Sequence, residues 1–231
     1  MPKASSTFSI KTAKAILTAL KPATEAAMGG LLTDVHPIAC GFEGCAFSAE
    51  HPKLGPVVLK VGRLRQDKME RYDPMLDYEA AAKILRARIP GVATVHGLVT
   101  SVGTKRNAGY VLVKERVSTD WAAYTAATGV TAAQLAKGDD ILSNAGVESA
   151  DACNDGDPWP RVHKNHQAVL DRTGLAGVLR GVKKLKSFGI CAGEDVKIEN
   201  LGWRAGPSGK PEVVIIDLGY TQQLDDGLCA F

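Results

Sequence analysis

The sequence predicts an α+β fold in two parts, a small antiparallel sheet with one helix and then a reduced, mostly helical second part. Short β-branched runs separated by glycine and proline turns fill the first half of the chain. Apolar residues at three- and four-residue steps recur in the second half. We expect an N-terminal helical extension at residues 1–33, a sheet domain at 34–117 and a helical domain at 118–231.

Composition and charge limit the class of protein. The chain has 231 residues, of which 45% are hydrophobic and 23% charged, so it can bury a substantial core and is not expected to be disordered. The net charge of +3 is dispersed, without a basic stripe interleaved with aromatics, so direct nucleic-acid binding is not expected. The apolar stretch around residues 16–20 is too short for a signal peptide or a membrane span.

The cysteines predict a reduced chain. There are 5 cysteines, an odd count, with no C-x-x-C pair and no matching histidine spacing. This pattern indicates neither a disulfide framework nor a zinc site. We therefore expect a cytoplasmic protein.

The first half of the chain predicts two helices and five short strands. The expected elements are an amphipathic helix at 8–20 that ends at Lys21 and Pro22, strands between 35 and 61 with turns at 41–44 and 52–56, a helix at 75–88 begun by Asp73 and Pro74, and strands at 94–100 and 109–117. Together they predict a small antiparallel sheet with one helix packed on it.

The second half predicts helices and a final hairpin. The expected elements are a helix at 121–137, an acidic loop at 139–157, one helix at 166–186 ended by Gly189, and a hairpin of strands 201–203 and 213–216 around 207–209. The hairpin starts just after Asn200 and ends just before Asp217. We therefore expect these two side chains at the same end of it.

A polar stretch before this hairpin carries the strongest chemical signal. Asp195 is followed by Lys197 and Asn200, and a β-branched run then ends at Asp217. Kinase-type phosphoryl transfer needs these residue types, because an Asp orients the attacking hydroxyl, a lysine offsets charge on the moving group, and an Asn with an Asp holds magnesium. Alternatively, Asp195 and Asn200 cap a loop and Asp217 is a turn residue. The occurrence of both halves in this order favours catalysis.

A glycine-containing turn near the start of the sheet is a candidate phosphate loop. Gly41 and Gly44 lie between two strand runs, although an ordinary hairpin also contains glycines. Lys60 follows on the next strand among apolar neighbours, so its charge is expected to have a partner. Glu79 on the following helix is the candidate, because a buried lysine needs a counter-charge to stay protonated. A surface pair of Glu79 with Lys83 is the alternative.

Taken in chain order, these motifs resemble those of the eukaryotic-type protein kinase family. The matching residues are Gly41-x-x-Gly44, Val57-Val58-Leu59-Lys60, Glu79, Asp195-x-Lys197-x-x-Asn200 and Asp217-Leu218-Gly219, and the similarity spans residues 35–220. Its most specific part is the Asp-x-Lys-x-x-Asn motif followed by Asp-Leu-Gly. Within the family, the chain is most similar to the early protein kinases of lytic short-tailed bacteriophages such as bacteriophage T7, through segments 51–62 and 89–92.

The resemblance implies a role for each matched residue. It implies a protein-kinase-like fold in which Lys60 and Glu79 form an ion pair, Asp195 is the catalytic base, Lys197 contacts phosphate, and Asn200 and Asp217 bind Mg²⁺, with Mn²⁺ as a substitute. Gly41 and Gly44 would cover the ATP phosphates, and the backbone of Glu115 and Val117 would bind adenine. The implied activity is phosphorylation of serine or threonine in host bacterial proteins, transcription and translation machinery among them, in the host cytoplasm.

The sequence also departs from the family pattern. Gly193 and Glu194 replace the usual His-Arg before Asp195, so activity should not depend on a phosphorylated activation loop. Ala39 stands at the first glycine of the nucleotide loop, Glu43 lies inside that loop, and Lys114 guards the adenine pocket. The chain stops at Phe231, which leaves no room for a peptide-binding platform. We expect residues 118–160 with the N-terminal helix, or a second subunit, to hold the substrate.

Two other functions fit the same residues. A small-molecule phosphotransferase of the aminoglycoside or choline kinase type shares the fold, and the missing platform favours it, but Lys197 stands where that class more often has histidine. A pseudokinase that inhibits a host protein by binding is favoured by the altered nucleotide loop. The retained metal and phosphate residues oppose that second alternative.

Overall fold

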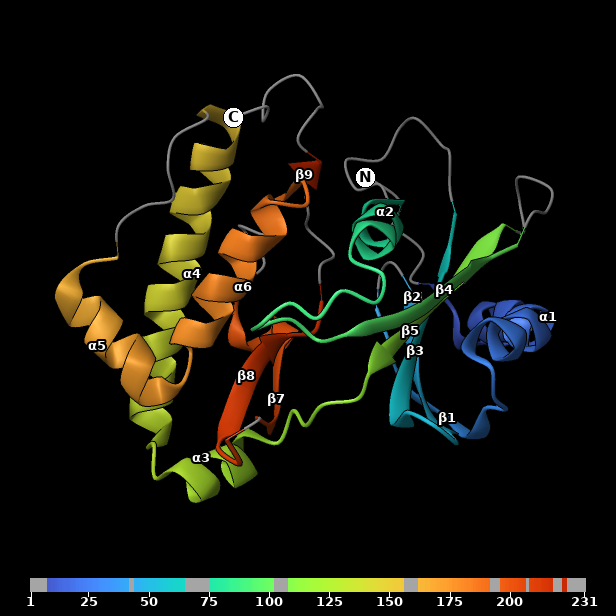
Figure 1. Ribbon diagram of the computed structural model, residues 1–231, viewed down its shortest axis with the longest axis horizontal. Coiled ribbons are helices and arrows are strands. Elements are labelled where there is room, and N and C mark those ends of the chain that lie inside the picture. The colour runs from blue at the N-terminus through green and yellow to red at the C-terminus, as the bar shows by residue number, and fades with distance from the viewer. Residues whose placement is uncertain are drawn as a thin grey trace, which may run out of the picture. The chain divides into compact units, whose positions relative to one another are not determined.

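A computed structural model describes residues 8–41, 44–64, 75–101, 108–155, 162–191, 196–206, 208–217 and 222–223. The chain divides into two compact units, the first of Met1–Ala87 and Thr94–Arg116, and the second of Arg88–Ala93 and Val117–Phe231. The predicted α+β class is confirmed: the first unit contains a five-stranded antiparallel sheet, and helices dominate the second (Figure 1). None of the helices in the described ranges is long and apolar enough to cross a membrane.

The sheet of the first unit consists of the hairpins that the sequence predicts. Its strands are β1 (Thr33–Cys40), β2 (Gly44–His51), β3 (Gly55–Arg63), β4 (Val95–Thr100) and β5 (Gly109–Glu115), in the order β1-β2-β3-β5-β4. Neighbouring strands are antiparallel throughout. Gly55, with φ of 70°, permits the tight reversal between β2 and β3.

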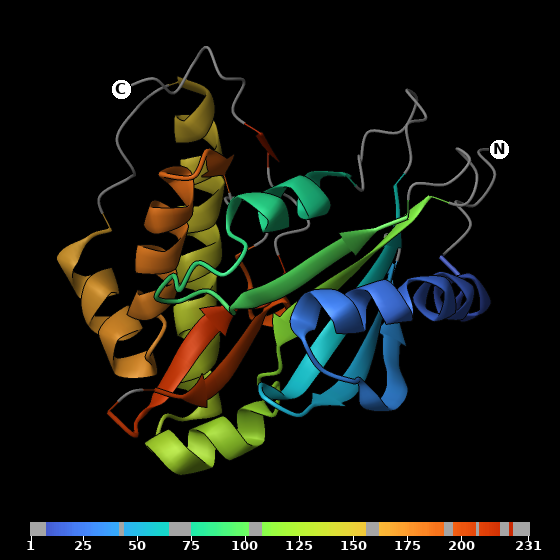
Figure 2. The same ribbon diagram turned by 45° about the vertical axis from the view of Figure 1, so that its right-hand side comes forward.

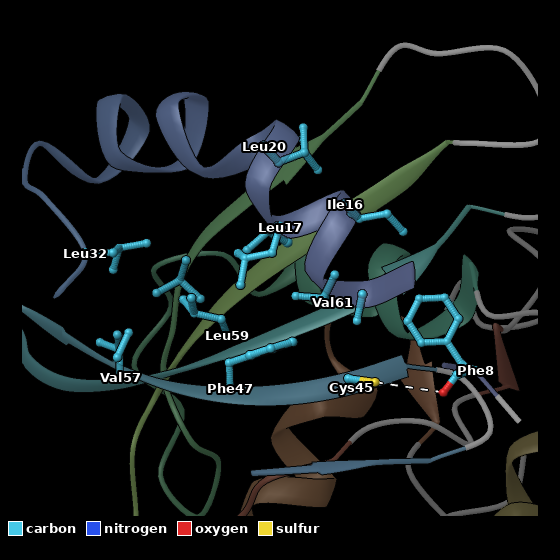
Figure 3. Packing of buried hydrophobic residues seen from close by; sticks show 14 residues of the cluster. Phe8, Ile16, Leu17, Leu20, Leu32, Cys45, Phe47, Val57, Leu59 and Val61 are labelled. Atoms are coloured by element: carbon cyan, nitrogen blue, oxygen red, sulfur yellow. Dashed lines mark hydrogen bonds between the residues drawn. The ribbon is translucent and has the colours of Figure 1, made fainter. Parts of the chain in front are cut away.

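Helix α1 (Ile10–Met28) covers one face of this sheet (Figure 2). Figure 3 shows Leu17 of this helix directed toward Leu59 of β3, with Phe47 of β2 beside Leu59; Leu20 belongs to the same buried cluster. All of these side chains are buried. The predicted N-terminal extension is therefore part of the core of the first unit, because its apolar stripe is buried on the sheet.

The prediction that the first helix ends at Pro22 is wrong, since α1 continues to Met28 with Pro22 inside it. An interior proline removes one helical hydrogen bond, at a cost of about 3 kcal/mol. Contacts beyond Pro22 oppose this cost. Thr24 is fully buried, and the Glu25 carboxylate accepts hydrogen bonds from Lys21 and from the backbone N–H of Leu32.

Helix α2 (Met75–Lys83) packs on β4 and β5, on the opposite face of the sheet from α1 (Figure 1). The rings of Tyr78 and Tyr110 lie with their centroids 6.0 Å apart. The sequence predicts this helix to residue 88, which is too long. Arg86 adopts a left-handed φ of 62° and its N–H donates to the carbonyl of Val95, so the chain has already left the helix there.

The second unit contains four helices within the described residues and a two-stranded hairpin. They are α3 (Trp121–Thr128), α4 (Ala132–Asp155), α5 (Lys164–Thr173) and α6 (Ala176–Lys186), with the hairpin strands β7 (Leu201–Ala205) and β8 (Pro211–Ile215) and the short pair β6 (Ile190–Cys191) and β9 (Gln222–Gln223). Helix α5 packs on α4 and α6, and α6 packs on β8 (Figure 1).

The acidic loop predicted at residues 139–157 is instead the continuation of α4 to Asp155. Its apolar residues are few but correctly spaced for one helical face. Leu135, Ile141, Leu142 and Ala145 are buried, so this face anchors the helix despite its acidic residues.

The single helix predicted at residues 166–186 is two helices, α5 and α6, separated at Gly174. Gly174 has φ of 75°, which suits glycine and ends α5. A Cβ at this position would also lie 2.3 Å from Tyr124 Oη. That hydroxyl donates to the carbonyl of Thr173 at 2.8 Å, so close packing of Tyr124 fixes the break.

Candidate functional site

The β7–β8 hairpin brings two of the predicted site residues to one end, as the sequence predicts. Leu201 pairs with Ile215, and the N–H of Ile216 donates to the carbonyl of Asn200 at 2.9 Å. Asn200 and Asp217 therefore flank the same end of the ladder on neighbouring strands. Both are half-buried.

The segment that enters this hairpin carries Lys197. Val196 is buried, whereas the Lys197 side chain is exposed and lies 3.5 Å from the Glu199 carboxylate. Residues Ile198–Asn200 form a single 3₁₀ turn, η1, and the Asn200 N–H donates to the Lys197 carbonyl at 2.8 Å. The predicted base Asp195 lies outside the described residues.

Asp139, on α4, contacts this segment, and the sequence prediction missed it. Its Oδ1 accepts a hydrogen bond from the N–H of Ile198 at 2.8 Å. Burial raises the pKa of Asp139, the Ile198 bond opposes that rise, and Glu199 and Asp140 add to it. The helical spacing of Ile141, Leu142 and Ala145 was the available signal that Asp139 lies on a helix.

The donor set at the hairpin end fits magnesium. Mg²⁺ prefers oxygen ligands and is commonly held by one or two side chains together with nucleotide phosphates. Asn200 offers an amide oxygen and Asp217 a carboxylate. Within the described ranges, no group of three or more His, Cys, Asp or Glu side chains gathers in a metal-binding arrangement. A cation here would therefore depend on the nucleotide phosphates for further ligands.

In the first unit, Lys60 points to the face of the sheet opposite α1. It lies between Leu59 and Val61, which belong to the core cluster under α1. Successive side chains of a strand alternate between faces, so Lys60 shares its face with its directly paired neighbours, Ala46 and Leu112. Leu112 is fully buried and Ala46 is half-buried on this face.

Glu79 is carried by α2, which packs on the same face as Lys60. Tyr110 contacts Tyr78 of α2 and pairs with Gly62, which lies two residues beyond Lys60 and therefore on the same face of the sheet. An ion pair between Lys60 and Glu79 would join β3 to α2 on this face of the sheet. That pair stays a prediction.

The two glycines of the candidate phosphate loop differ in whether their surroundings require glycine. A Cβ at Gly44 would lie 2.5 Å from the carbonyl oxygen of Val61, so strand packing alone requires glycine there. A Cβ at Gly41 would meet nothing closer than 4.0 Å, so no such requirement applies. The Gly41 N–H donates to the Gly44 carbonyl at 2.8 Å and closes the turn.

The expectation of a chain without disulfides is wrong, because Cys40 and Cys45 are joined across the β1–β2 hairpin with a Cα–Cα distance of 4.0 Å. The two residues are direct cross-strand partners, a relation that the search for C-x-x-C spacing misses. Cys45 Sγ also lies 3.9 Å from the carbonyl oxygen of Phe8 (Figure 3). A disulfide sulfur has no proton to donate, so this contact becomes a hydrogen bond only in the reduced form.

The predicted adenine-binding backbone lies where one unit ends and the other begins. In the first unit, the N–H of Glu115 donates to the Thr94 carbonyl at 2.9 Å, so Glu115 would have to bind a base through its carbonyl. Lys114, the predicted guard residue, is only 6% exposed. Val117 belongs to the second unit, where a Cβ on Gly202 would lie 2.4 Å from its Cγ2.

Comparison of the chain with models of known protein families finds no match, and comparison with curated proteins finds none either.

Proposed function

We propose that the chain is an ATP- and Mg²⁺-dependent protein kinase that transfers the γ-phosphate to serine or threonine. The observation that carries this proposal is the hairpin end, where the Ile216–Asn200 backbone bond keeps Asn200 and Asp217 on neighbouring strands. An Asn and an Asp held this way, with Lys197 three residues before the Asn, form the pattern that phosphoryl transfer uses.

Each residue has a defined part in the proposed reaction. The hydroxyl oxygen of the substrate bonds to the γ-phosphorus, the bond to the ADP oxygen breaks, and the hydroxyl proton passes to the Asp195 carboxylate. Lys197 offsets negative charge on the transferred group. Asn200 and Asp217 hold Mg²⁺, which neutralises phosphate charge when bound.

The sheet unit would bind the nucleotide. Lys60 contacts the phosphates and Glu79 keeps it aligned, while the turn that contains Gly41 and Gly44 closes over the phosphates. The support is the position of Lys60 on the sheet face that α2 also covers, with Ala46 and Leu112 beside it. The backbone of the segment after β5 would bind adenine.

The proposed substrates are host bacterial proteins, including those of transcription and translation. This follows from the resemblance to phage early protein kinases. The proposed location is the host cytoplasm, where thiols are kept reduced and the Cys40–Cys45 bond would open. A second copy of the chain is the proposed means of holding the peptide substrate.

The test is transfer of labelled phosphate from ATP with Mg²⁺ or Mn²⁺, using a bacterial lysate in one arm and a panel of aminoglycosides and choline-like alcohols in the other. We expect label on serine and threonine of lysate proteins. Lys60→Ala and Asp217→Ala should reduce it to background without changing the thermal unfolding midpoint.

The other outcomes point to the alternatives. Label on small alcohols alone would indicate a small-molecule phosphotransferase. No transfer to lysate or to the chain itself, together with stoichiometric co-purification of a host protein, would indicate a binding pseudokinase.

A further inference from the structure

The 197–200 segment carries two of the proposed site residues and begins a helical turn that its own residues do not cap. Lys197, at the N-cap position of η1, makes no side-chain capping bond. The first N–H groups of a helix have no partner inside it and need one from elsewhere. At Ile198 the partner is Asp139 Oδ1 at 2.8 Å, which comes from α4, 59 residues away in sequence.

Two backbone bonds hold the rest of this segment. The Asn200 N–H donates to the Lys197 carbonyl, which closes the turn on itself. The Ile216 N–H donates to the Asn200 carbonyl, which ties the end of the turn to the hairpin. Neither bond fixes the start of the segment to the helices. The Asp139 bond does so.

The charges around Asp139 also act on this segment. Lys197 attracts the Asp139 carboxylate, whereas Glu199 and its helix neighbour Asp140 repel it. Asp139 is half-buried, and Asp140 is exposed. The carboxylate of Asp139 is therefore placed to bond the backbone of the turn, and its attraction to the proposed phosphate-contacting lysine is a weaker addition.

We infer that Asp139 is a positioning residue, which holds residues 197–200 so that Lys197 and Asn200 are correctly placed for phosphoryl transfer. The inference rests on the proposed function. Helix α4 thereby supplies the hydrogen bond that holds the start of this segment, which none of the motif residues supplies. Asp139 acts through the Ile198 N–H and does not itself contact the reacting atoms.

The test compares Asp139→Ala, Asp139→Asn and the matched control Asp140→Ala. Asp139→Ala should accelerate amide hydrogen exchange at Ile198 by about tenfold or more, because a hydrogen bond to a charged group is lost. It should lower kcat by about tenfold to a hundredfold with little change in KM for ATP, as expected for misplaced groups. Asp139→Asn keeps the acceptor oxygen, so it should retain most of the wild-type protection from exchange at Ile198 and most of the wild-type kcat. Asp140→Ala should change neither.

Unchanged exchange at Ile198 in Asp139→Ala would overturn the inference, as would equal loss of kcat in Asp139→Ala and Asp140→Ala. If Asp139→Ala fails to fold, Asp139→Glu replaces it. That variant keeps the charge but moves the carboxylate by one methylene, so kcat should fall at an unchanged melting temperature, and wild-type kcat would overturn the inference.

A wild-type chain that transfers no phosphate would refute the proposed function separately. The inference is then decided by exchange at Ile198 and by Mn²⁺ affinity. Asp139→Ala should weaken Mn²⁺ binding and Asp139→Asn should preserve it, and equal affinity in all three proteins would overturn the inference.

Discussion

The two units hold their candidate functional residues by different means. Lys60 lies in the middle of β3, with ladder partners on both sides and with Leu59 and Val61 fully buried on the other face. Asn200 lies just outside a two-stranded ladder, and Lys197 is exposed one turn earlier. Lys60 is therefore fixed by the core, whereas Lys197 and Asn200 are fixed by individual hydrogen bonds.

This difference separates residues whose substitution should lower the stability of the fold from residues whose substitution should change only the geometry of the site. Shifting the Lys60 backbone requires disruption of the sheet, so changes to its buried neighbours Leu59 and Val61 should first lower the free energy of unfolding. Shifting residues 197–200 requires the loss of one or two hydrogen bonds, so changes there should alter the site while the fold persists. The predictions below test that separation.

The largest expected effect on stability is in the sheet core. Leu59 is 0% exposed beneath α1, so Leu59→Ala should lower the free energy of unfolding by about 2–5 kcal/mol through the cavity that it leaves. Urea unfolding measures the change. The control Leu31→Ala removes a side chain that is 67% exposed and should change stability by less than about 0.5 kcal/mol. A loss at Leu59 as small as that at Leu31 would contradict the account.

A smaller effect is expected at the hairpin disulfide. Cys40→Ser opens a loop of sequence separation 5, which should cost about 2 kcal/mol when the wild type is oxidised. Urea unfolding without and with a dithiol reductant checks this. The free energies of unfolding of the variant and the wild type should be equal once the reductant is present. A wild-type stability that does not respond to reductant would show that the bond does not form in solution.

The smallest expected effect concerns Asp139 and pH. Burial raises the pKa of Asp139 in the folded chain, so its contribution to stability is present below the unfolded pKa and is lost as pH rises through the folded pKa. Asp139→Asn removes this loss. The unfolding free energy of the variant should therefore rise relative to wild type as pH rises above the ordinary aspartate pKa of about 3.9. A relative fall over this range would contradict the stated cause.

The sheet unit was largely predictable because its signals are local. β-branched runs and the turn at Gly55 fix the strands, and the close cross-strand neighbours follow from strand order. The disulfide was missed because it depends on register, which puts Cys40 directly opposite Cys45. The continuation of α1 through Pro22 depends on tertiary contacts of Thr24 and Glu25, which sequence spacing does not reveal.

The helical unit was harder to predict for the same physical reason. The break at Gly174 depends on Tyr124, 50 residues earlier, whose hydroxyl occupies the space that a side chain would need. Residues 139–155 of α4 were predicted as a loop because they are rich in acidic residues and their apolar face is narrow. Asp139 could not be assigned to the site, because its partner Ile198 comes close only in the folded chain.

The most direct test of the central claim is binding of the complex of Mn²⁺ with a non-hydrolysable ATP analogue, measured by titration calorimetry. If Asn200 and Asp217 hold the metal together, Asn200→Ala and Asp217→Ala should each weaken binding by about tenfold or more, as loss of a bond to a charged group would. The exposed-carboxylate control Asp140→Ala should bind as wild type does. Wild-type affinity in both hairpin variants would contradict the account.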